Sequence, residues 1–551
     1  MSIESKIRDI AAKVAAPSAA IAISGLRGSA PAWLVSRIME QTASPLLVIT
    51  PDSDSADQFH RELLFYCGFQ EGVQIFPAWE NAPYEHASPH PDVTGLRLNT
   101  LFGIMNGTAK AVVAPVTALC QRVLSRSDLG KVSDYLVAGE EADREALLEK
   151  LVRLGYSHVP LVEDRGSFAA RGGILDIFPP NLAAPVRIEF FGDFVETIRT
   201  FDPLTQRSLH PLEELVLLPS REIILNQEVM QQLPPRLKKL CDSLDIPLPR
   251  RRELLEQLQS AIYPPGIEYL QPLFHPNLET IFDYLGNGAV RVLTDPDSIS
   301  DAQERFAGEL ELAEAKAQES DDIVCERSAL FLQIEEVKEG ISAGARLAMP
   351  VIELHEPGAT KLSMKTQDNS DLRISISPEG ESLMKPLADR ISGWLDEQKH
   401  VIMICSQKGQ SQRLFDLLSP HGLPVALDGN SFPVVVGRRD RRVSIITGEI
   451  SRGFRIPDEQ LVVVAEEEIF GRRVKRRGLT EARKKQILTS LAELKPGDHM
   501  VHLDFGVGLY RGLQHLTLGE VEGDFLLLEY AGSDRLYLPV DRLNLVQRYV
   551  G

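Results

Sequence analysis

The chain has 551 residues and carries 78 acidic against 59 basic side chains, a formal net charge of −19. This length predicts several domains, about three to five, and the 43% apolar content suffices for ordinary buried cores. The acidic balance argues against a protein whose whole surface binds nucleic acid, although local basic runs can still do so.

Cysteine usage and hydrophobicity predict a cytoplasmic protein. The five cysteines are odd in number and none are paired at metal-ligand spacing, which favours reduced thiols over disulfides. The N-terminus offers no secretory signal, and no apolar run reaches the length that spans a bilayer. His86 and His90, the closest histidine pair, lie in a Pro-rich loop, so we expect no metal site.

The first 118 residues alternate apolar strands with helices, which is typical of a parallel α/β domain. The expected strands are 19–24, 46–50, 73–76 and 111–115, and the expected helices are 1–10, one that ends near 41, and 54–66.

The loop after the first strand, with Gly25 and Gly28, invites comparison with a phosphate-binding loop. That motif requires Gly, Lys and Ser or Thr where this chain has Ala30, Pro31 and Ala32. Alanine restricts the backbone, proline removes the lysine charge and one N–H, and the second alanine offers no hydroxyl to magnesium. We expect a nucleotide-binding fold whose site binds no cofactor; the alternative is an unusual active site.

Residues 165–208 are predicted to form a small antiparallel sheet. The expected strands are 168–178, 186–191 and 194–201, with a stop at 179–181 and a two-residue hairpin turn at 192–193. The glycine pair at 172–173 is typical of a bulge or of a close backbone approach.

Alternation places Arg187, Glu189 and Phe191 on one face of the middle strand. An exposed aromatic beside an arginine is typical of interface hot spots. Alternatively, Phe191 covers a neighbouring loop or helix.

Three motifs in this stretch carry a resemblance: FAARG at 168–172, LDIFP at 175–179 and FDPLTQR at 201–207. The stretch resembles the UvrA-binding domain 2 of the repair helicase UvrB, and more closely that of bacterial transcription-repair coupling factors (Mfd). The resemblance implies a module that binds UvrA and does no chemistry. The UvrA-binding positions of the family fall on Arg171, Arg187 and Phe191.

Residues 76–101, 266–269 and 274 resemble the UvrB-like first domain of the same family. The resemblance implies a first domain split into 1–118 and 219–350, with an inserted module at 119–218. The helical stretch 304–319 belongs to the end of the first domain.

Residues 366–470, which we call the third domain, form another α/β unit. The expected strands are 401–405, 424–427, 443–447 and 461–465, with a helix at 410–418. We find no catalytic constellation in this domain, and the basic cluster 438–442 is predicted to be a solvated loop. The basic linker 471–488 has eight Lys or Arg and one acid between 471 and 485, so we favour a flexible linker over a nucleic-acid contact.

The C-terminal domain, 489–551, is predicted to be a small β-barrel because short strands alternate with glycines. The motifs HLDFGVGLYRG and LYLPVDRL resemble the RNA-polymerase-interacting domain of coupling factors and CarD-type regulators. The resemblance implies a Tudor/SH3-like fold that docks on the polymerase β subunit, with the key contact at Leu516. Leu516 shares a strand face with Gln514 and Leu518, and alternation leaves open whether it lies in the core or at the interface.

Together these features predict a multidomain α/β chain with an inserted α+β module and a C-terminal barrel. The resemblance implies the N-terminal half of a coupling factor, which recruits UvrA and binds stalled RNA polymerase in nucleotide excision repair. The family's ATP-driven DNA translocase motor, which uses ATP and Mg²⁺, is expected after Gly551. We therefore expect a monomer without ATPase activity; the alternatives are a free-standing polymerase-binding regulator and an ATP-dependent helicase.

Overall fold

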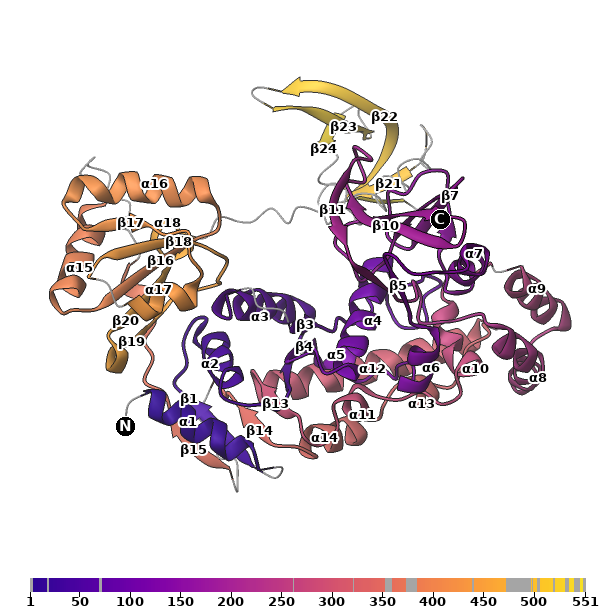
Figure 1. Cartoon of the computed structure of the whole chain (residues 1–551), viewed down its shortest axis with the longest axis horizontal. Coiled ribbons are helices and arrows are strands. Elements are labelled where there is room, and N and C mark those ends of the chain that lie inside the picture. The colour runs from indigo at the N-terminus through magenta and orange to yellow at the C-terminus, as the bar shows by residue number, and fades with distance from the viewer. Residues whose placement is uncertain are drawn as a thin grey trace. The chain divides into compact units, whose positions relative to one another are not determined.

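The computed structural model of the chain describes residues 3–16, 19–68, 72–260, 262–320, 322–351, 359–372, 384–438, 441–471, 497, 499–502, 506–518, 521–530, 535–539 and 546–548. The chain divides into two compact units, 1–471 and 472–551, which are described separately (Figure 1). Within the described ranges, no helix has the length and apolar character needed to cross a membrane.

A seven-stranded parallel sheet organises the first domain, in the order β15-β1-β14-β13-β2-β4-β3. Its strands are β1 (Ala20–Ser24), β2 (Leu46–Thr50), β3 (Val73–Ile75), β4 (Ala111–Pro115), β13 (Val290–Leu293), β14 (Arg346–Ala348) and β15 (Thr360–Ser363). Strands from before and after the inserted module therefore pair within one sheet. The four strands predicted before residue 118 are confirmed. β2 and β4 are buried at every position, as expected for strands inside a parallel sheet that is covered on both faces.

Helices cover this sheet on both sides. They are α1 (Ile3–Val14), α2 (Ala30–Met39), α3 (Ser53–Tyr66), α4 (Pro91–Met105), α5 (Val116–Leu119), α11 (Ile281–Leu285), α12 (Pro296–Glu319) and α14 (Ile334–Ser342). Capping residues begin several of them: the side chain of Asp52 accepts a hydrogen bond from the N–H of Ser55 at α3. Asp295 caps α12 in the same way.

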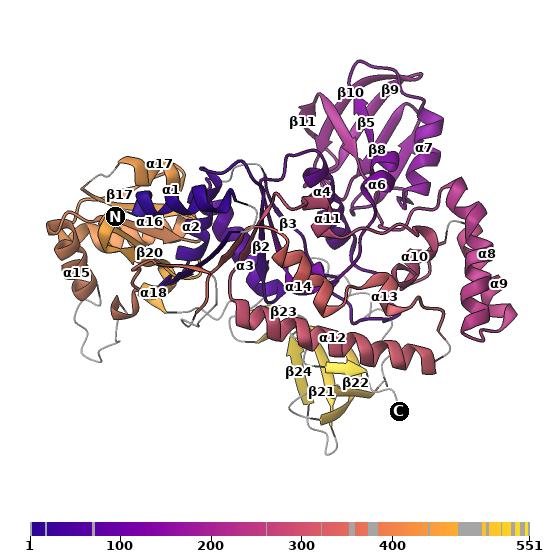
Figure 2. The same cartoon turned by 90° about the horizontal axis from the view of Figure 1, so that it is seen from below.

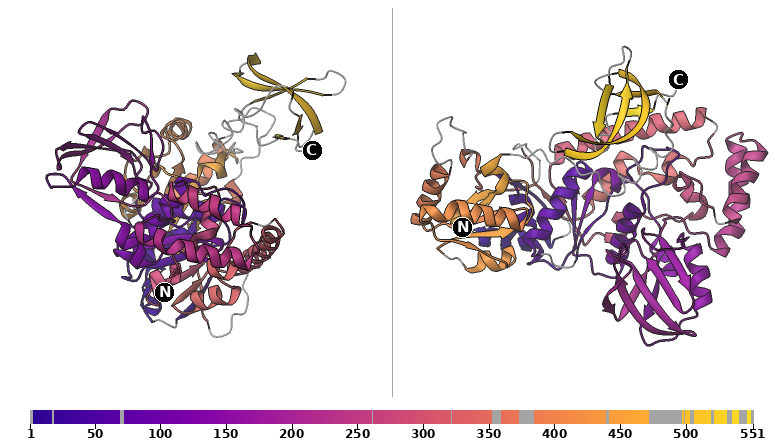
Figure 3. Two further views of the ribbon diagram at one scale, coloured as in Figure 1. Left: turned by 90° about the vertical axis from the view of Figure 1, so that its right-hand side faces the viewer. Right: turned by 90° about the horizontal axis from the view of Figure 1, so that it is seen from above.

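The inserted module contains a six-stranded sheet in the order β11-β10-β9-β8-β7-β6. The strands are β6 (Ser157–His158), β7 (Ser167–Arg171), β8 (Ile174–Phe178), β9 (Val186–Phe191), β10 (Phe194–Phe201) and β11 (Ser208–Leu212). A second pair, β5 (Asp134–Val137) and β12 (Glu214–Leu217), and the helices α6 (Arg126–Val132) and α7 (Arg144–Arg153) complete it (Figures 2 and 3).

The predicted strand 168–178 is wrong as a single strand. It folds back as the hairpin β7–β8, in which Arg171 lies opposite Ile174 and the glycine pair makes the turn. Gly172 has φ of +57°, which glycine adopts without strain. The predicted close approach is confirmed at Gly173, whose carbonyl accepts a 2.7 Å hydrogen bond from the N–H of Phe190.

A helical segment follows the inserted module and had no counterpart in the sequence prediction. Its helices are α8 (Gln227–Ser243), α9 (Leu248–Gln259), α10 (Gln271–Phe274) and α13 (Arg327–Leu330) (Figure 2). Helix α8 contains Pro234 and Pro235, residues that normally interrupt a helix. Its buried side chains Val229, Leu233 and Leu237 recur every four residues and hold it against α10.

The third domain has a five-stranded sheet in the order β17-β18-β16-β20-β19, with only β19 antiparallel. Its strands are β16 (His400–Cys405), β17 (Val425–Leu427), β18 (Val443–Thr447), β19 (Phe454–Ile456) and β20 (Leu461–Ala465). Its helices are α15 (Lys385–Asp396), α16 (Lys408–Leu418), α17 (Phe432–Arg438) and α18 (Glu466–Phe470). The predicted strands and helix of this domain are confirmed.

The two faces of β16 belong to different cores. Val401 and Met403 pack with α15 and α16 inside the third domain. Ile402 and Ile404 instead join a core that contains α2 and α3 of the first domain. The first and third domains therefore share one hydrophobic core.

Aromatic side chains fill this shared core. Trp33 lies 5.8 Å from Phe454 between ring centroids, and Tyr66 lies 4.9 Å from Phe432 in an edge-to-face arrangement. Phe432 is the first residue of α17, which contacts α3 and lies beside it in Figure 1. Such pairs add stability beyond the area they bury.

The second unit contains a five-stranded antiparallel sheet in the order β24-β23-β22-β21-β25. The strands are β21 (His499–His502), β22 (Gly506–Leu518), β23 (Val521–Glu529), β24 (Arg535–Pro539) and β25 (Val546–Arg548). Gly512, with φ of +119°, lies at a register shift between β22 and β23. No pairing of β24 with β25 closes the sheet among the residues described in this unit, so the barrel stays a prediction.

Candidate functional site

Two glycines shape the loop that joins β1 to α2. Gly25 and Gly28 have φ of +80° and +56°, in the left-handed region that glycine adopts most readily. A Cβ atom at Gly28 would come closer than 3.0 Å to the carbonyl oxygen of Gly453, so a larger residue would displace that segment. The predicted strand, glycine loop and helix are therefore present.

The hydrogen-bond donors of this loop bind protein groups from far along the chain. The N–H and the hydroxyl of Ser29 both donate to the carbonyl oxygen of Arg452, at 3.1 and 2.7 Å. The N–H of Arg27 donates to the hydroxyl of Thr366 at 2.8 Å, and that hydroxyl donates to the carbonyl of Gly25. Oxygens of the third domain thus accept hydrogen bonds from the N–H groups of Arg27 and Ser29. A phosphate-binding loop directs N–H groups of this kind at its ligand.

The three substituted motif positions give the loop no replacement ligands. Ala30 and Ala32 are fully buried, and Pro31 lies in the first turn of α2. None of them offers a charge to phosphate or a hydroxyl to magnesium. These residues do not fit a nucleotide, and the loop instead fastens the first domain to the third.

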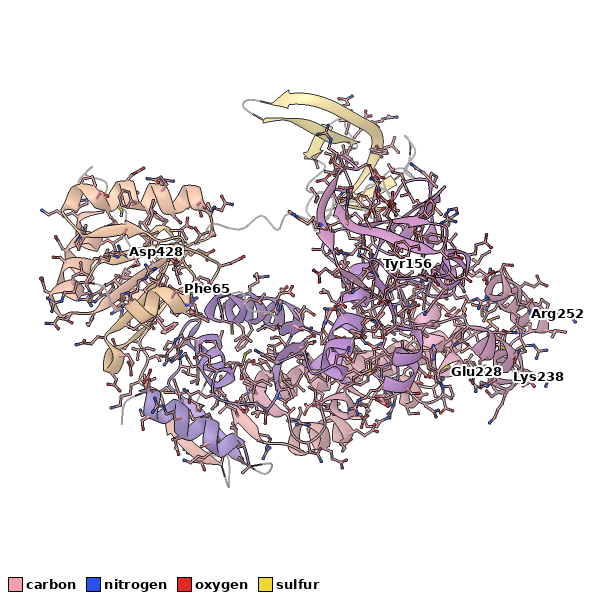
Figure 4. All side chains as sticks on the ribbon, in the orientation of Figure 1. Phe65, Tyr156, Glu228, Lys238, Arg252 and Asp428 are labelled. Carbon is pink, nitrogen blue, oxygen red and sulfur yellow. The ribbon has the colours of Figure 1, made fainter. Side chains whose placement is uncertain are left out.

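The C-terminal half of α3 strengthens the same contact. Glu62 is buried and accepts a 2.8 Å hydrogen bond from the N–H of Ser451, and burial raises the pKa of its carboxyl. Phe65 lies where α3 meets the third domain (Figure 4), and a Cβ atom at Gly448 would overlap its ring. The contact is closely packed as well as hydrogen-bonded.

Strand β9 presents two different faces, as alternation predicted. Ile188 and Phe190 are buried in the core. Arg187 and Glu189 are half-buried on the opposite face, and Phe191, on the same face, is 80% exposed. The alternative in which Phe191 covers a neighbouring loop or helix is therefore wrong for the part of the chain that the structure describes.

Arg187 is held by groups of the module itself. Its guanidinium donates to both carboxylate oxygens of Asp176, at 2.7 and 2.8 Å, and to the carbonyl of Gln206 at 3.2 Å. It also lies over the ring of Phe201, 4.8 Å from the centroid. The hydrogen bond with Asp176 raises the pKa of Arg187. Arg187 therefore braces this face, and it presents less of its side chain to a partner than the sequence led us to expect.

Arg171 and Phe191 lie at the turns of two adjacent hairpins. Arg171 is exposed at the β7–β8 turn, and its guanidinium donates to the carbonyl of Pro160. Phe191 pairs with Phe194 across the β9–β10 turn. The structure thus places Arg171 and Phe191 on exposed turns and Arg187 in an internal ion pair.

Asp176 is the residue that the sequence analysis missed on this face. It is an acid within the otherwise apolar strand Ile174–Phe178 and lies directly opposite Arg187 in the sheet. An isolated charge in a buried strand needs a partner. The acidic residue in an apolar strand is visible in the sequence. The register of β8 against β9, which identifies Arg187 as its partner, is not.

Leu516 lies in β22, opposite Gly523 of β23. Its backbone is described and its side chain lies outside the described residues. Gln514, two positions earlier on the same strand face, is exposed.

The basic cluster 438–442 is partly used inside the third domain. Arg438 and Arg442 contact the carboxylate of Asp428 at 2.8 and 3.5 Å, and the carboxylate is 4% exposed. Burial alone would raise the pKa of Asp428 (labelled in Figure 4), but hydrogen bonds from Asn430 and the positive charges of the two arginines lower it. Residues 439–440 and the basic linker after Gly471 lie outside the described residues.

No group of three His, Cys, Asp or Glu side chains in the described ranges is arranged to hold a metal ion. His90 instead accepts a hydrogen bond from the N–H of Asp92 at the start of α4, and His86 contacts Asp322. All five cysteines are buried and unpaired with one another, as expected for reduced thiols.

Comparisons with known proteins match both predicted partner-binding modules. Residues 135–223 match the UvrB interaction domain family, and residues 494–550 match the CarD-like/TRCF RID domain family. Similar curated proteins are the transcription-repair-coupling factors of Myxococcus xanthus, Escherichia coli and Bacillus subtilis, at 33%, 29% and 28% identity.

Each of these matches covers 96% of this chain and 45% of the relative, so the chain spans less than half the length of these relatives. The two domain matches lie in the order that the resemblance implied. Over 96% of its length, the chain is therefore similar to transcription-repair-coupling factors, of which it spans about 45%.

Proposed function

We propose that the chain is the recruiting part of a transcription-repair coupling factor, with one module for the repair protein UvrA and another for RNA polymerase. The observation that carries this proposal is the presence of both interaction domains in one chain. The module boundaries that we propose, 119–218 and 489–551, contain most of the matched ranges. A chain of this kind couples transcription to repair by binding both partners and needs no chemistry of its own.

The outer face of the inserted module supports the UvrA assignment. Phe191 is 80% exposed beside half-buried charged residues, which suits a hot spot ringed by polar contacts. Arg171 adds an exposed guanidinium at the neighbouring turn. We assign UvrA contacts to Phe191 and Arg171, and to Arg187 the role of shaping the sheet face on which they lie.

Calorimetric titration of UvrA into the chain tests this assignment. Phe191→Ala should weaken binding by about 2 kcal/mol or more, and Arg171→Ala should weaken it measurably. Neither variant should lower the melting temperature, because both side chains are exposed. Unchanged affinity in both variants would remove this face from the UvrA interface.

The C-terminal sheet supports polymerase binding. Its edge strands β24 and β25 have no partner on their outer sides among the described strands, and an exposed edge can pair with a strand of another protein. We propose that this domain docks on the β subunit and that Leu516 contributes the contact. The exposure of Gln514 on the same strand face favours an interface position for Leu516 over a core position.

We also propose that the chain acts as a monomer. We further propose that it hydrolyses no ATP, because the glycine loop binds the third domain and lacks the ligands for nucleotide. We expect the ATP-driven motor that the resemblance implies to lie in the part of the relatives that this chain does not span. Two rival functions remain testable. A pull-down that finds polymerase but never UvrA would favour a free-standing regulator, and ATP turnover that depends on residues 25–32 would favour a helicase.

A further inference from the structure

The turn between β10 and β11 carries a leucine whose side chain is exposed to solvent. Leu204 is 88% exposed, more than any other large apolar side chain in the described ranges. It belongs to the FDPLTQR motif at 201–207. Single exposed leucines are ordinary on protein surfaces. Leu204 differs because the backbone that carries it is fixed by several hydrogen bonds.

The backbone around Leu204 is tied by its own turn. The carboxylate of Asp202 accepts hydrogen bonds from the N–H groups of Leu204 and Thr205, at 3.0 and 2.7 Å. The carbonyl of Asp202 accepts a hydrogen bond from the N–H of Gln206 at 2.7 Å, and the N–H of Asp202 donates to the carbonyl of Arg207 at 3.0 Å. These bonds hold the backbone of the turn in one conformation.

Gln206 closes the turn in a strained conformation. Its φ is +59°, a left-handed value that is uncommon for residues other than glycine. Its side-chain amide donates to the carbonyls of Val162 and Pro203, at 3.1 and 2.7 Å. Strained backbone persists where surrounding contacts over-determine it, and it gathers at functional sites.

Arg187 connects this turn to the face that carries Phe191. The same guanidinium that pairs with Asp176 donates to the carbonyl of Gln206. Phe191 is the last residue of β9 and pairs with Phe194 at the start of β10, whereas Leu204 lies three residues after the end of β10. The eight residues of β10 separate its two ends by about 23 Å. A standard interface buries about 800 Å² on each partner, a patch about 30 Å across. One partner can therefore cover both side chains.

We infer that Leu204 is a second apolar anchor of the UvrA-binding face, presented in a preorganised turn that Arg187 and Gln206 brace. This inference rests on the proposed binding of UvrA. A rigid turn loses little conformational freedom when a partner binds, so its apolar contact contributes to affinity at low entropic cost. The inference also gives Arg187 a function that its internal ion pair permits: positioning the turn.

Calorimetry with purified UvrA and the intact chain tests the inference through matched variants. Leu204→Ser should weaken binding about tenfold or more, whereas Leu204→Met, which keeps an apolar side chain, should bind close to the parent. The control is Leu312→Ser: Leu312 is 75% exposed but lies in α12, outside the inserted module. It should bind UvrA like the parent.

The outcomes separate this inference from the proposed function. If the parent binds UvrA and Phe191→Ala weakens it while Leu204→Ser has no effect, the second anchor is refuted and the proposed function stands. If the parent does not bind UvrA at all, both fall. If Leu204→Ser lowers the melting temperature, Leu204→Ala replaces it: weaker binding at an unchanged melting temperature supports the inference, and binding equal to that of the parent overturns it.

Discussion

Replacing Gly28 with alanine measures how tightly the third domain closes the glycine loop. The first cost is conformational. A φ of +56° lies in the left-handed region, which costs alanine about 1–2 kcal/mol relative to glycine. The second cost is steric, because the new Cβ atom would press on the carbonyl of Gly453 and lie 3.0 Å from that of Arg452. Overpacking of this kind costs about 1–3 kcal/mol.

Gly107→Ala provides the matched control. Gly107 has φ of +71° in the same domain, and a Cβ atom there would meet no atom within 4 Å. It therefore carries the conformational cost without the steric one. The difference between the two variants in free energy of unfolding should be about 1–3 kcal/mol, the cost of displacing the third-domain segment.

Urea unfolding followed by tryptophan fluorescence reports this difference. Trp33 is a suitable probe because it lies in the shared core, 5.8 Å from Phe454. With a urea dependence of about 3 kcal/mol per M, the steric cost alone lowers the midpoint by about 0.3–1 M. Equal midpoints for Gly28→Ala and Gly107→Ala would refute the packing of the third domain on the loop.

Three further predictions concern the polymerase contact, nucleotide and thiols. Leu516→Arg should leave the melting curve unchanged and abolish pull-down of the polymerase β subunit, since a charge would have to be desolvated at the interface. Loss of the cooperative melting transition would place Leu516 in the core, and retained pull-down would exclude it from the interface. The chain should release no phosphate from ATP above background, with or without DNA; steady turnover by the parent that is lost on altering residues 25–32 would overturn the assignment. Burial raises the pKa of Cys120, Cys325 and Cys405 to about 12, so a thiol-specific reagent at pH 8 should label them only after unfolding; rapid labelling of the native chain would contradict their burial.

The sequence predicted local structure best where a single pattern decided it. Strand β9 was predicted at its observed bounds because alternation and a Gly-Asp turn agree on them. The β7–β8 hairpin was misjudged because a glycine pair is equally typical of a bulge and of a turn, and only the pairing of Arg171 with Ile174 decides between them. Helix α8 was not predicted, since two consecutive prolines obscure its apolar repeat.

The partner-binding face was predicted in part for a similar reason. Strand parity correctly put Arg187 and Phe191 on one side. The ion pair that holds Arg187 depends on the register of β8 against β9, which alternation within a single strand cannot supply. The turn that contains Leu204 belongs to a motif visible in the sequence. The hydrogen bonds that fix its conformation are visible only in the folded chain.

The glycine loop after β1 shows how the start of a helix can serve as a contact between domains. A glycine loop at a helix N-terminus directs N–H groups outward, and buried N–H groups without partners are costly. In this chain Ser29 is fully buried, and both of its donors bind Arg452, which lies 423 positions further along the chain. The sequence shows that the loop lacks the lysine and glycine of the phosphate-binding motif, but it could not identify the carbonyl of Arg452 as the acceptor for Ser29. It follows that removing the third domain would leave these donors unsatisfied and uncover the aromatic core beside them, so the third domain is part of the first domain's stability.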